Sequence, residues 1–511
     1  MRLLKSRTDK LPKLAWLAEV DSARDEIALL CGDWVEVRDG FFVEGVWDGP
    51  FGKAEFHKTA NIFGSGGVIT PDGIVFVSSG CTTDYLYYRH DKEKLSVSNS
   101  LPFLLAHTQD ELDPKHAGYT QACDSIVDGI DKYQPEIPTR NGAVQRLMFR
   151  NLVLENGKVR LDDKPLCEPF AQFADYAKFV RDRYANIVLN ARDADRTREY
   201  KILSTQSKGY DSTAVNAFAA KFGIDTAFTV SQSKGSGAFA ENDTESASDD
   251  DGTEIANRLG FPCVSIERRR FQQELEDEYL YFAGIANCED LNFSGITPYI
   301  DSPSILLTGT LGELYYPATY YSSRFPGEPV GTDLRRGDLS GHGLTEVRLA
   351  SGFVQLPLIY VGAQQRESIT RITESKEMDP WRLNNAYDRP IPRRVAEEAG
   401  VPRAWFGQKK MATAISYSRP NIPQGSKLRK EFFSFLVAKG LLKSWQIRLF
   451  RWVHRYNALL WFASPRKYSW MYYLSRAKLK ITGKGLSPIW KDLDSSLYCY
   501  SVNKRIRDYI R

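Results

Sequence analysis

The chain has 511 residues, of which 42% are hydrophobic and 26% charged. This length and balance predict two or three globular domains and exclude a wholly disordered or fibrous protein. The seven cysteines form no Cys-x-x-Cys pair and the six histidines no ligand spacing, so neither disulfides nor a transition metal are predicted. No apolar run approaches the roughly 20 residues of a membrane span, and the start lacks a secretory signal, so we expect a cytoplasmic protein.

Residues 30–107 have the pattern of short strands separated by turns. Apolar stretches rich in Val, Ile and Phe are interrupted by Asp-Gly and Gly-Gly pairs, which are typical of hairpins. An antiparallel β domain is therefore predicted. The Gly-Ser-Gly-Gly run at 64–67 is followed by no Lys-Ser/Thr, so we interpret it as a turn rather than a nucleotide-binding loop.

The pattern changes in the middle of the chain. Apolar residues at helical spacing between 168 and 200 predict a helix. From Tyr200 the order becomes strand, turn, helix, strand, which is a parallel βαβ unit and indicates an α/β domain. Residues 231–253 are rich in Ser, Gly and acids and predict a mobile surface loop, after which the α/β alternation resumes.

The first strand of this unit runs into Ser-Lys-Gly-Tyr-Asp-Ser (residues 207–212) at a predicted helix start. Backbone N–H groups and the positive end of the helix dipole converge there, which suits phosphate oxygens. The hydroxyls of Ser207 and Ser212 can donate hydrogen bonds, Gly209 permits close approach of the backbone, and Asp211 can hold Mg²⁺. An ordinary helix cap is the alternative interpretation.

This run resembles the pyrophosphate-binding loop Ser-Gly-Gly-x-Asp-Ser of the asparagine synthetase family, with Lys208 in place of the first Gly. A second stretch, residues 306–315, is similar to the family's Ser-Gly-Glu-Gly-x-Asp-Glu run. There Thr310 replaces the first acid and Glu313 stands at the Asp position. The resemblance implies that ATP and Mg²⁺ bind here, with Asp211 and Glu313 near the metal; a helix-start acid is the alternative for Glu313.

The family also places a lysine in a late loop, where it stabilises negative charge in the transition state. Lys409 or Lys410 would take this catalytic role, and a pair of solvated loop lysines is the alternative.

Residues 75–106 are similar to the glutaminase domain of the same family. The family's nucleophile is a Cys exposed after Met removal, whereas this chain begins Met-Arg-Leu, so no glutamine hydrolysis is expected. The resemblance implies an α+β N-terminal domain of the Ntn-hydrolase type over 1–167. It further implies an α/β PP-loop domain (adenine nucleotide α-hydrolase-like) over 168–425, followed by a basic, aromatic helical extension over 426–511.

The extension is strongly basic. Residues 427–480 contain 13 Lys or Arg and a single acid, Glu431. Hydrophobic side chains recur every three or four positions from Leu442 to Leu460, which predicts a cationic amphipathic helix. Such a stripe most often packs on the protein's own body; an interfacial membrane helix, and a partner or polyanion surface, are the alternatives.

Together these features predict an ATP-dependent carbon–nitrogen ligase that activates a small-molecule or peptide carboxylate, releases AMP and pyrophosphate, and forms an amide with an amine. One alternative is a pseudoenzyme, impaired by Lys208 and Thr310, that serves as a scaffold or as a peripheral membrane partner. Another is a tRNA-modifying enzyme with a basic RNA surface. Since no paired cysteines suit sulfur transfer, no specific nucleic-acid partner is expected.

Overall fold

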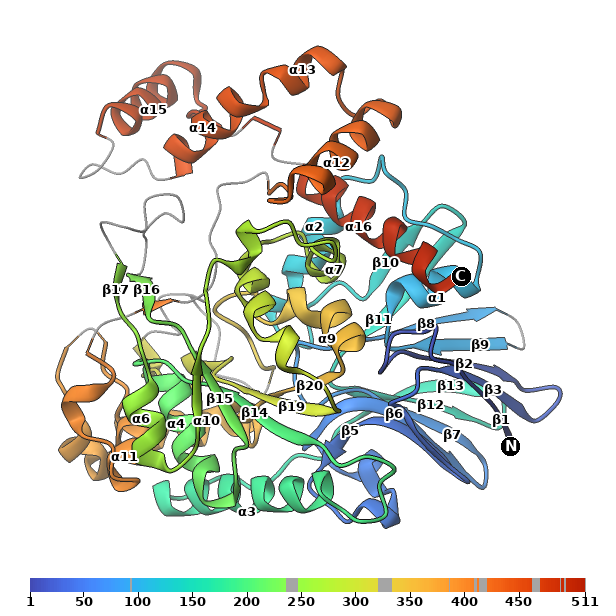
Figure 1. Cartoon of the computed structure of the whole chain (residues 1–511), viewed down its shortest axis with the longest axis vertical. Helices are drawn as coiled ribbons and strands as arrows, with labels where there is room; N and C mark the ends of the chain where they lie inside the picture. Colours follow the sequence, from blue (N-terminus) through green and yellow to red (C-terminus); the bar gives the residue numbers. More distant parts are fainter. Residues whose placement is uncertain are drawn as a thin grey trace.

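The chain folds into a β-rich N-terminal region, an α/β middle region and a helical C-terminal region (Figure 1). The mixed α+β architecture predicted from the sequence is thereby confirmed. The structure is a computed structural model. It describes residues 1–91, 94–235, 247–319, 333–385, 387–408, 411–412, 421–461, 469–487, 489–490 and 493–510.

Two sheets form the N-terminal region. The larger has the order β1-β3-β2-β9-β8-β11-β10, with strands β1 (Arg2–Arg7), β2 (Trp16–Asp21), β3 (Glu26–Cys31), β8 (Leu86–Asp91), β9 (Lys94–Ser98), β10 (Glu136–Thr139) and β11 (Gly142–Leu147). The smaller has the order β13-β12-β7-β6-β5-β4, with strands β4 (Glu36–Arg38), β5 (Phe41–Trp47), β6 (Ile62–Thr70), β7 (Gly73–Val77), β12 (Arg150–Glu155) and β13 (Lys158–Asp163). Paired strands are antiparallel except β1 and β3.

The two sheets share a dry core. The ring of Trp16 on β2 lies 5.0 Å from that of Phe42 on β5 and 6.2 Å from that of Phe76 on β7. All three side chains are fully buried. Stacked and edge-on aromatic contacts of this kind add to the free energy gained from apolar burial.

The glycine run at 64–67 lies inside β6, so the prediction of a turn there was wrong. Gly64 stands opposite Gly45 of β5. A Cβ on Gly64 would overlap the carbonyl oxygen of Glu44. The glycines therefore allow two strands to approach closely. A glycine-rich run in a sequence does not distinguish this use from a turn.

The middle region contains a five-stranded parallel sheet of order β18-β15-β14-β19-β20. Its strands are β14 (Lys201–Thr205), β15 (Thr226–Thr229), β18 (Cys263–Ser265), β19 (Ser304–Thr308) and β20 (Phe353–Pro357). The helices around it are α3 (Phe173–Ala191), α4 (Tyr210–Ala219), α6 (Thr253–Leu259), α7 (Tyr279–Gly284), α9 (Thr345–Ser351), α10 (Arg366–Glu374) and α11 (Pro390–Glu398). The strand order reverses between β14 and β19, which is where open α/β sheets bind ligands.

Residues 231–253 contain strands, although the sequence predicts a loop. Strand β16 (Gln232–Gly235) pairs antiparallel with β17 (Ala247–Asp249) and with β21 (Met411–Ala412). Backbone pairing with a distant strand supplies the hydrogen bonds, so no apolar face is required. Residues 236–246 lie outside the described part of the chain.

The basic extension divides into two parts. Helix α16 (Leu493–Ile510) is largely buried and packs against α7 and α1 (Leu101–His107). By contrast, α13 (Ser444–Arg448), α14 (Phe450–Trp461) and α15 (Ser469–Thr482) stand away from the body, beyond α12 (Ser426–Ala438) (Figure 1). Leu442 is buried, but Trp445 and Trp452 are 58% and 71% exposed, so these two positions of the predicted stripe do not pack on the body. No helix in the described residues has the length and apolarity needed to cross a membrane.

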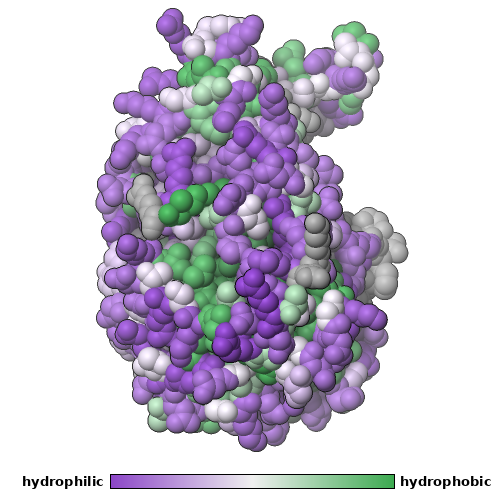
Figure 2. Space-filling model, turned by 90° about the vertical axis from the view of Figure 1, so that its right-hand side faces the viewer, coloured by the Kyte–Doolittle hydropathy of each residue, from purple (hydrophilic) through white to green (hydrophobic). Residues whose placement is uncertain are grey.

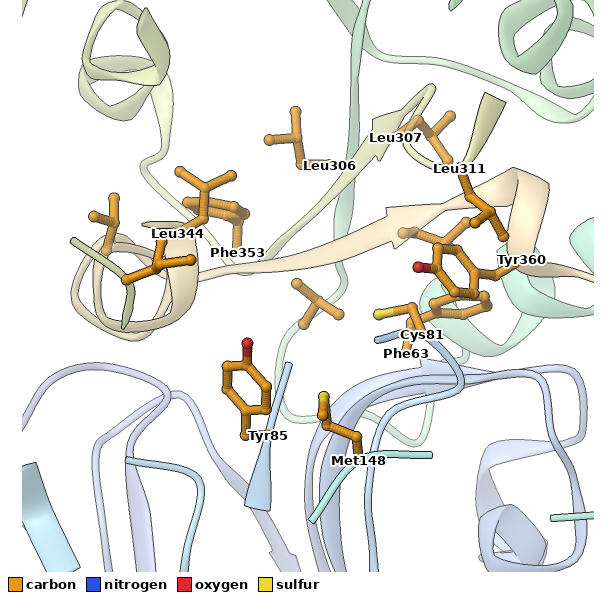
Figure 3. Packing of buried hydrophobic residues seen from close by; sticks show 14 of the residues in the cluster. Phe63, Cys81, Tyr85, Met148, Leu306, Leu307, Leu311, Leu344, Phe353 and Tyr360 are labelled. Atoms are coloured by element: carbon orange, nitrogen blue, oxygen red, sulfur yellow. The ribbon is translucent and has the colours of Figure 1, made fainter. Parts of the chain in front are cut away.

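One apolar core runs from the sheets into the middle region. Side chains from the two regions face each other across it (Figure 3): Phe63, Cys81, Tyr85 and Met148 on one side, and Leu306, Leu307, Leu311, Leu344, Phe353 and Tyr360 on the other. The cavity described below therefore rests partly on the N-terminal sheets.

A buried ion-pair cluster crosses the same boundary. Arg348 on α9 places Nε 2.6 Å from Asp84 Oδ1, and its Nη1 lies 2.9 Å from Glu44 Oε2. All three side chains are nearly inaccessible to solvent. Because these charges are buried, the loss of any one of them would leave its partner charged without solvent or a counter-ion.

We expect Arg348→Met to lower the free energy of unfolding by about 3–5 kcal/mol, because it leaves two carboxylates buried without their cation. Urea unfolding measures this change. Arg160→Met is the matched control, since Arg160 pairs with Glu155 and Asp162 on the surface and its loss is expected to change little. Equal effects of the two substitutions would contradict this account.

Candidate functional site

The Ser-Lys-Gly-Tyr-Asp-Ser run joins the end of β14 to the start of α4. Gly209 is the residue that precedes the helix, and its N–H donates to Ser207 Oγ over 3.1 Å. The hydroxyls of Ser207 and Ser212 lie 2.8 Å apart, and the backbone N–H of Ser207 donates to Ser212 Oγ. The two serines thus hold the loop in shape through their own hydrogen bonds.

A cavity of about 260 Å³ opens at the carboxyl ends of the parallel strands. Ser207, Gly209, Asp211 and Ser212 line it, together with residues 308–313, which run on from the last residue of β19. Phe228 to Val230 at the end of β15 also line it. The volume is slightly below the range of about 300–1,000 Å³ typical of ligand pockets, and the position is where α/β sheets bind ligands.

Asp211 lies tightly against the loop that follows β19. A Cβ added to Gly309 would come within 2.7 Å of the Asp211 Cβ, and one added to Gly312 would overlap its carboxylate. The carboxylate forms an ion pair with the guanidinium of Arg389, which is almost fully buried. Asp211 is therefore fixed between a glycine-lined wall and a cation.

Lys208 turns away from the cavity. Its ammonium group forms an ion pair with Asp249, and its backbone N–H donates to Asp250 Oδ1 over 2.9 Å. The residue does not adopt the left-handed backbone conformation that would favour glycine. The Lys in place of Gly is thus accommodated without backbone strain, and its charge is used outside the cavity.

Glu313 and Thr310 lie in the second loop and line the same cavity. The carboxylate of Glu313 accepts a hydrogen bond from the backbone N–H of Gly337. Thr310 Oγ1 lies 3.1 Å from Thr308 Oγ1. The fold thus brings Asp211 and Glu313, 102 residues apart in the chain, to one cavity.

Lys409 and Lys410, the two candidate catalytic lysines, lie outside the described residues. Met411, the residue that follows them, pairs with Gly235 of β16.

Sequence reasoning missed most of the charges around the cavity. Besides Asp211 and Glu313, four carboxylates and one guanidinium line it within the described residues: Asp250, Glu289, Asp290, Asp338 and Arg389. They come from polar stretches with no periodicity, and only the fold assembles them. The surplus of carboxylates disfavours an unshielded polyphosphate and favours divalent cations or a positively charged group. In the described part of the chain, no three His, Cys, Asp or Glu side chains are arranged as a preformed metal site.

Burial changes the protonation of two of these acids. It raises the pKa of Glu289 to about 8, helped by the nearby charges of Asp338 and Asp290. It also raises the pKa of Asp290 to about 6, although Asp290 accepts backbone N–H bonds from Gly341 and Gly343. At neutral pH Glu289 therefore carries a proton, which reduces the repulsion within the cavity.

A chain of polar contacts connects the cavity wall to the N-terminal sheets. The hydroxyl of Tyr85 bonds to Nδ1 of His342, and Nε2 of His342 lies 2.6 Å from Nη1 of Arg336. Arg336 in turn lies 3.6 Å from Asp338 at the cavity. Burial and the Arg336 charge hold the pKa of His342 well below its ordinary value, so the ring is neutral and accepts from Arg336.

Comparisons with known proteins identify no family. No protein-family model matches the chain, and no curated protein matches it. The family resemblance of the two loops therefore stays a prediction.

The raised pKa of Glu289 predicts a pH-dependent stability. Because the folded state binds this proton more tightly than the unfolded chain does, the stabilisation is complete below the ordinary pKa of 4.5 and is lost as the pH rises through about 8. Glu289→Gln is always neutral, so we expect it to gain on the order of 1–3 kcal/mol relative to the wild type between about pH 5 and pH 9.

Urea unfolding at several pH values measures this gain. Glu136→Gln on the exposed edge of β10 is the control and should show no such trend. A stability difference between Glu289→Gln and the wild type that does not change with pH would contradict the assignment.

Proposed function

We propose that the protein is an ATP-dependent, adenylate-forming ligase of the asparagine synthetase type, which activates a carboxylate and transfers it to an amine. The observation that carries the proposal is the position of residues 207–212, at the carboxyl end of the central strand and the start of α4, beside the loop that bears Glu313. The parallel strand order supports a PP-loop fold, and the packed sheets that precede it support an Ntn-hydrolase-like domain.

The residues present suit the groups that this reaction uses. Backbone N–H groups at the start of α4 and the hydroxyls of Ser207 and Ser212 suit the oxygens of pyrophosphate. The hard carboxylate oxygens of Asp211 and Glu313 suit Mg²⁺, which when bound would offset phosphate charge and stabilise the departing pyrophosphate. If Asp211 were to bind the metal directly, its carboxylate would exchange Arg389 for the cation.

Arg389 then has a role of its own. Once released from Asp211, its planar guanidinium can bind phosphate oxygens with two parallel hydrogen bonds. Within the part of the chain that the structure describes, the buried Nε atom of Arg389 has no hydrogen-bond partner, and the guanidinium lies 4.2 Å from the centre of the Tyr316 ring. Arg389 thus joins Lys409 and Lys410 as a candidate for charge stabilisation.

In this proposal the N-terminal region does not hydrolyse glutamine. We infer that the sheets act as a support for the cavity, through the apolar core and the contacts from Tyr85 to Arg336.

A second candidate function is supported by the ion pair between Asp211 and Arg389. If that pair persists, the metal ligand is lost, and Thr310 offers no carboxylate to replace it. The protein would then be a pseudoenzyme that acts as a scaffold.

The two candidates differ in binding of Mg²⁺-ATP. We expect the wild type to unfold at a higher temperature with millimolar Mg²⁺-ATP, because a ligand at about 100 times its Kd adds about 2.7 kcal/mol to stability. Asp211→Asn and Gly312→Ala should lose this shift, each compared with its own ligand-free midpoint. Gly52→Ala is the control, since its Cβ meets only ordinary contact distances.

Absence of a shift in the wild type would favour the scaffold. A shift that depends on Asp211 would justify screening carboxylic acids for pyrophosphate exchange. Exchange that depends on added glutamine would contradict the proposed loss of glutaminase activity.

A further inference from the structure

Exposed hydrophobic side chains gather in one part of the molecule. The described residues 444–461 and 469–487, which include α13, α14 and α15, are called here the basic lobe. Fifteen large hydrophobic side chains are exposed in the described chain, and nine of them lie between Trp445 and Ile489. Figure 2 shows hydrophobic and hydrophilic side chains side by side on the uppermost part of the molecule.

The apolar side chains follow helical rows. On α15, Trp470, Tyr473, Leu474 and Ile481 recur at three, four or seven positions and all are exposed, Ile481 by 83%. Residues at this spacing share one face of a helix. In most proteins such a face is buried in the core, so its exposure indicates a surface that binds something apolar.

Cations flank these rows. Arg451 and Arg455 on α14 and Arg476 and Lys480 on α15 are each spaced by four residues and exposed. Among the described residues, none of these four cations forms an ion pair. The sequence has no Asp or Glu between residues 432 and 491. The basic lobe therefore presents apolar rows bordered by uncompensated positive charge.

The lobe has packing contacts with α12 and with residues 489–490. The ring of Phe450 lies 5.0 Å from that of Phe433 on α12 and 6.2 Å from that of Trp490. Asn457 donates to the carbonyl oxygen of Ile489 over 2.7 Å and accepts from its N–H over 2.8 Å. The apolar side chains thus stay exposed although the lobe has its own packing contacts.

We propose that the basic lobe is a docking surface for a membrane that contains anionic phospholipids. Trp and Tyr side chains favour the headgroup boundary, the aliphatic Leu474 and Ile481 can enter the acyl region, and Arg and Lys bind lipid phosphates. A nucleic acid would pair with the cations and leave the aliphatic rows in water. The charge and the apolar rows together fit a lipid surface, on which the lobe lies without crossing it.

Co-sedimentation of the full-length protein with vesicles tests this surface. We expect binding to vesicles of phosphatidylcholine and phosphatidylglycerol in equal amounts, and at least about fivefold weaker binding to phosphatidylcholine alone. Replacing Arg451 and Arg455 by Gln should weaken binding by about tenfold, and Trp452→Ala combined with Trp470→Ala should do the same. Trp fluorescence should shift to shorter wavelength on binding.

Surface controls separate the lobe from the rest of the protein. Leu189→Ala on α3, where Leu189 is 70% exposed, and Lys158→Gln on β13 should leave vesicle binding unchanged. All these side chains are on the surface, so the variants should keep the wild-type unfolding temperature.

Three results would overturn the proposal. One is equal binding to neutral and anionic vesicles; another is retention by single-stranded RNA without binding to vesicles. The third is a concentration-dependent dimer that Trp452→Ala disrupts, since a second copy would then cover the rows. None of these results depends on whether the cavity binds ATP.

Discussion

A buried guanidinium between two carboxylates fixes how the halves of the molecule meet. Arg348 lies in α9, the helix that directly precedes β20 of the parallel sheet. Its partners Glu44 and Asp84 belong to the N-terminal region. Glu44 also accepts hydrogen bonds from Ser65 and Asn99. Since charges without solvent require close partners, the sheets cannot shift relative to β20 without losing these contacts. The apolar core supplies most of the adhesion, and the charges select one arrangement.

The charges around the cavity also need close partners, but the described residues there supply more carboxylates than cations. Six carboxylates face it, and Arg389 is the cation that lines it among the described residues. Part of the repulsion is relieved by the proton on Glu289, and part by backbone N–H groups that bind Asp290. A surplus of carboxylates of this kind favours cations over an unshielded polyphosphate. The backbone at Gly312 lies so close to the Asp211 carboxylate that this side chain has little room to move.

The C-terminal segment shows how one composition serves two structural roles. Helix α16 buries Leu497, Val502 and Ile506 against α7 and α1, and the buried Arg505 pairs with Glu346 at 3.1 Å. In the described residues, Arg451, Arg455, Arg476 and Lys480 of the basic lobe form no ion pair, and the apolar rows beside them stay exposed. The two parts differ in their packing partners, because α16 packs its apolar side chains on α7 and α1 and its Arg505 pairs with an acid of the body.

Local patterns in the sequence determined much of the fold. Strand alternation predicted short strands over residues 30–107, where β4, β5 and β7 lie, although the glycine run inside β6 was interpreted as a turn. The switch to strand–helix–strand predicted β14, α4 and β15, and both patterns depend on residues within a few positions of each other. The same holds for the loop at 207–212, which lies at a helix start as expected. Only the tertiary structure decided that Asp211 meets Arg389, 178 residues away, that β16 pairs with β21, and that the tryptophan rows stay exposed. Those outcomes depend on which surfaces come together during folding, and periodicity carries no information about the partner.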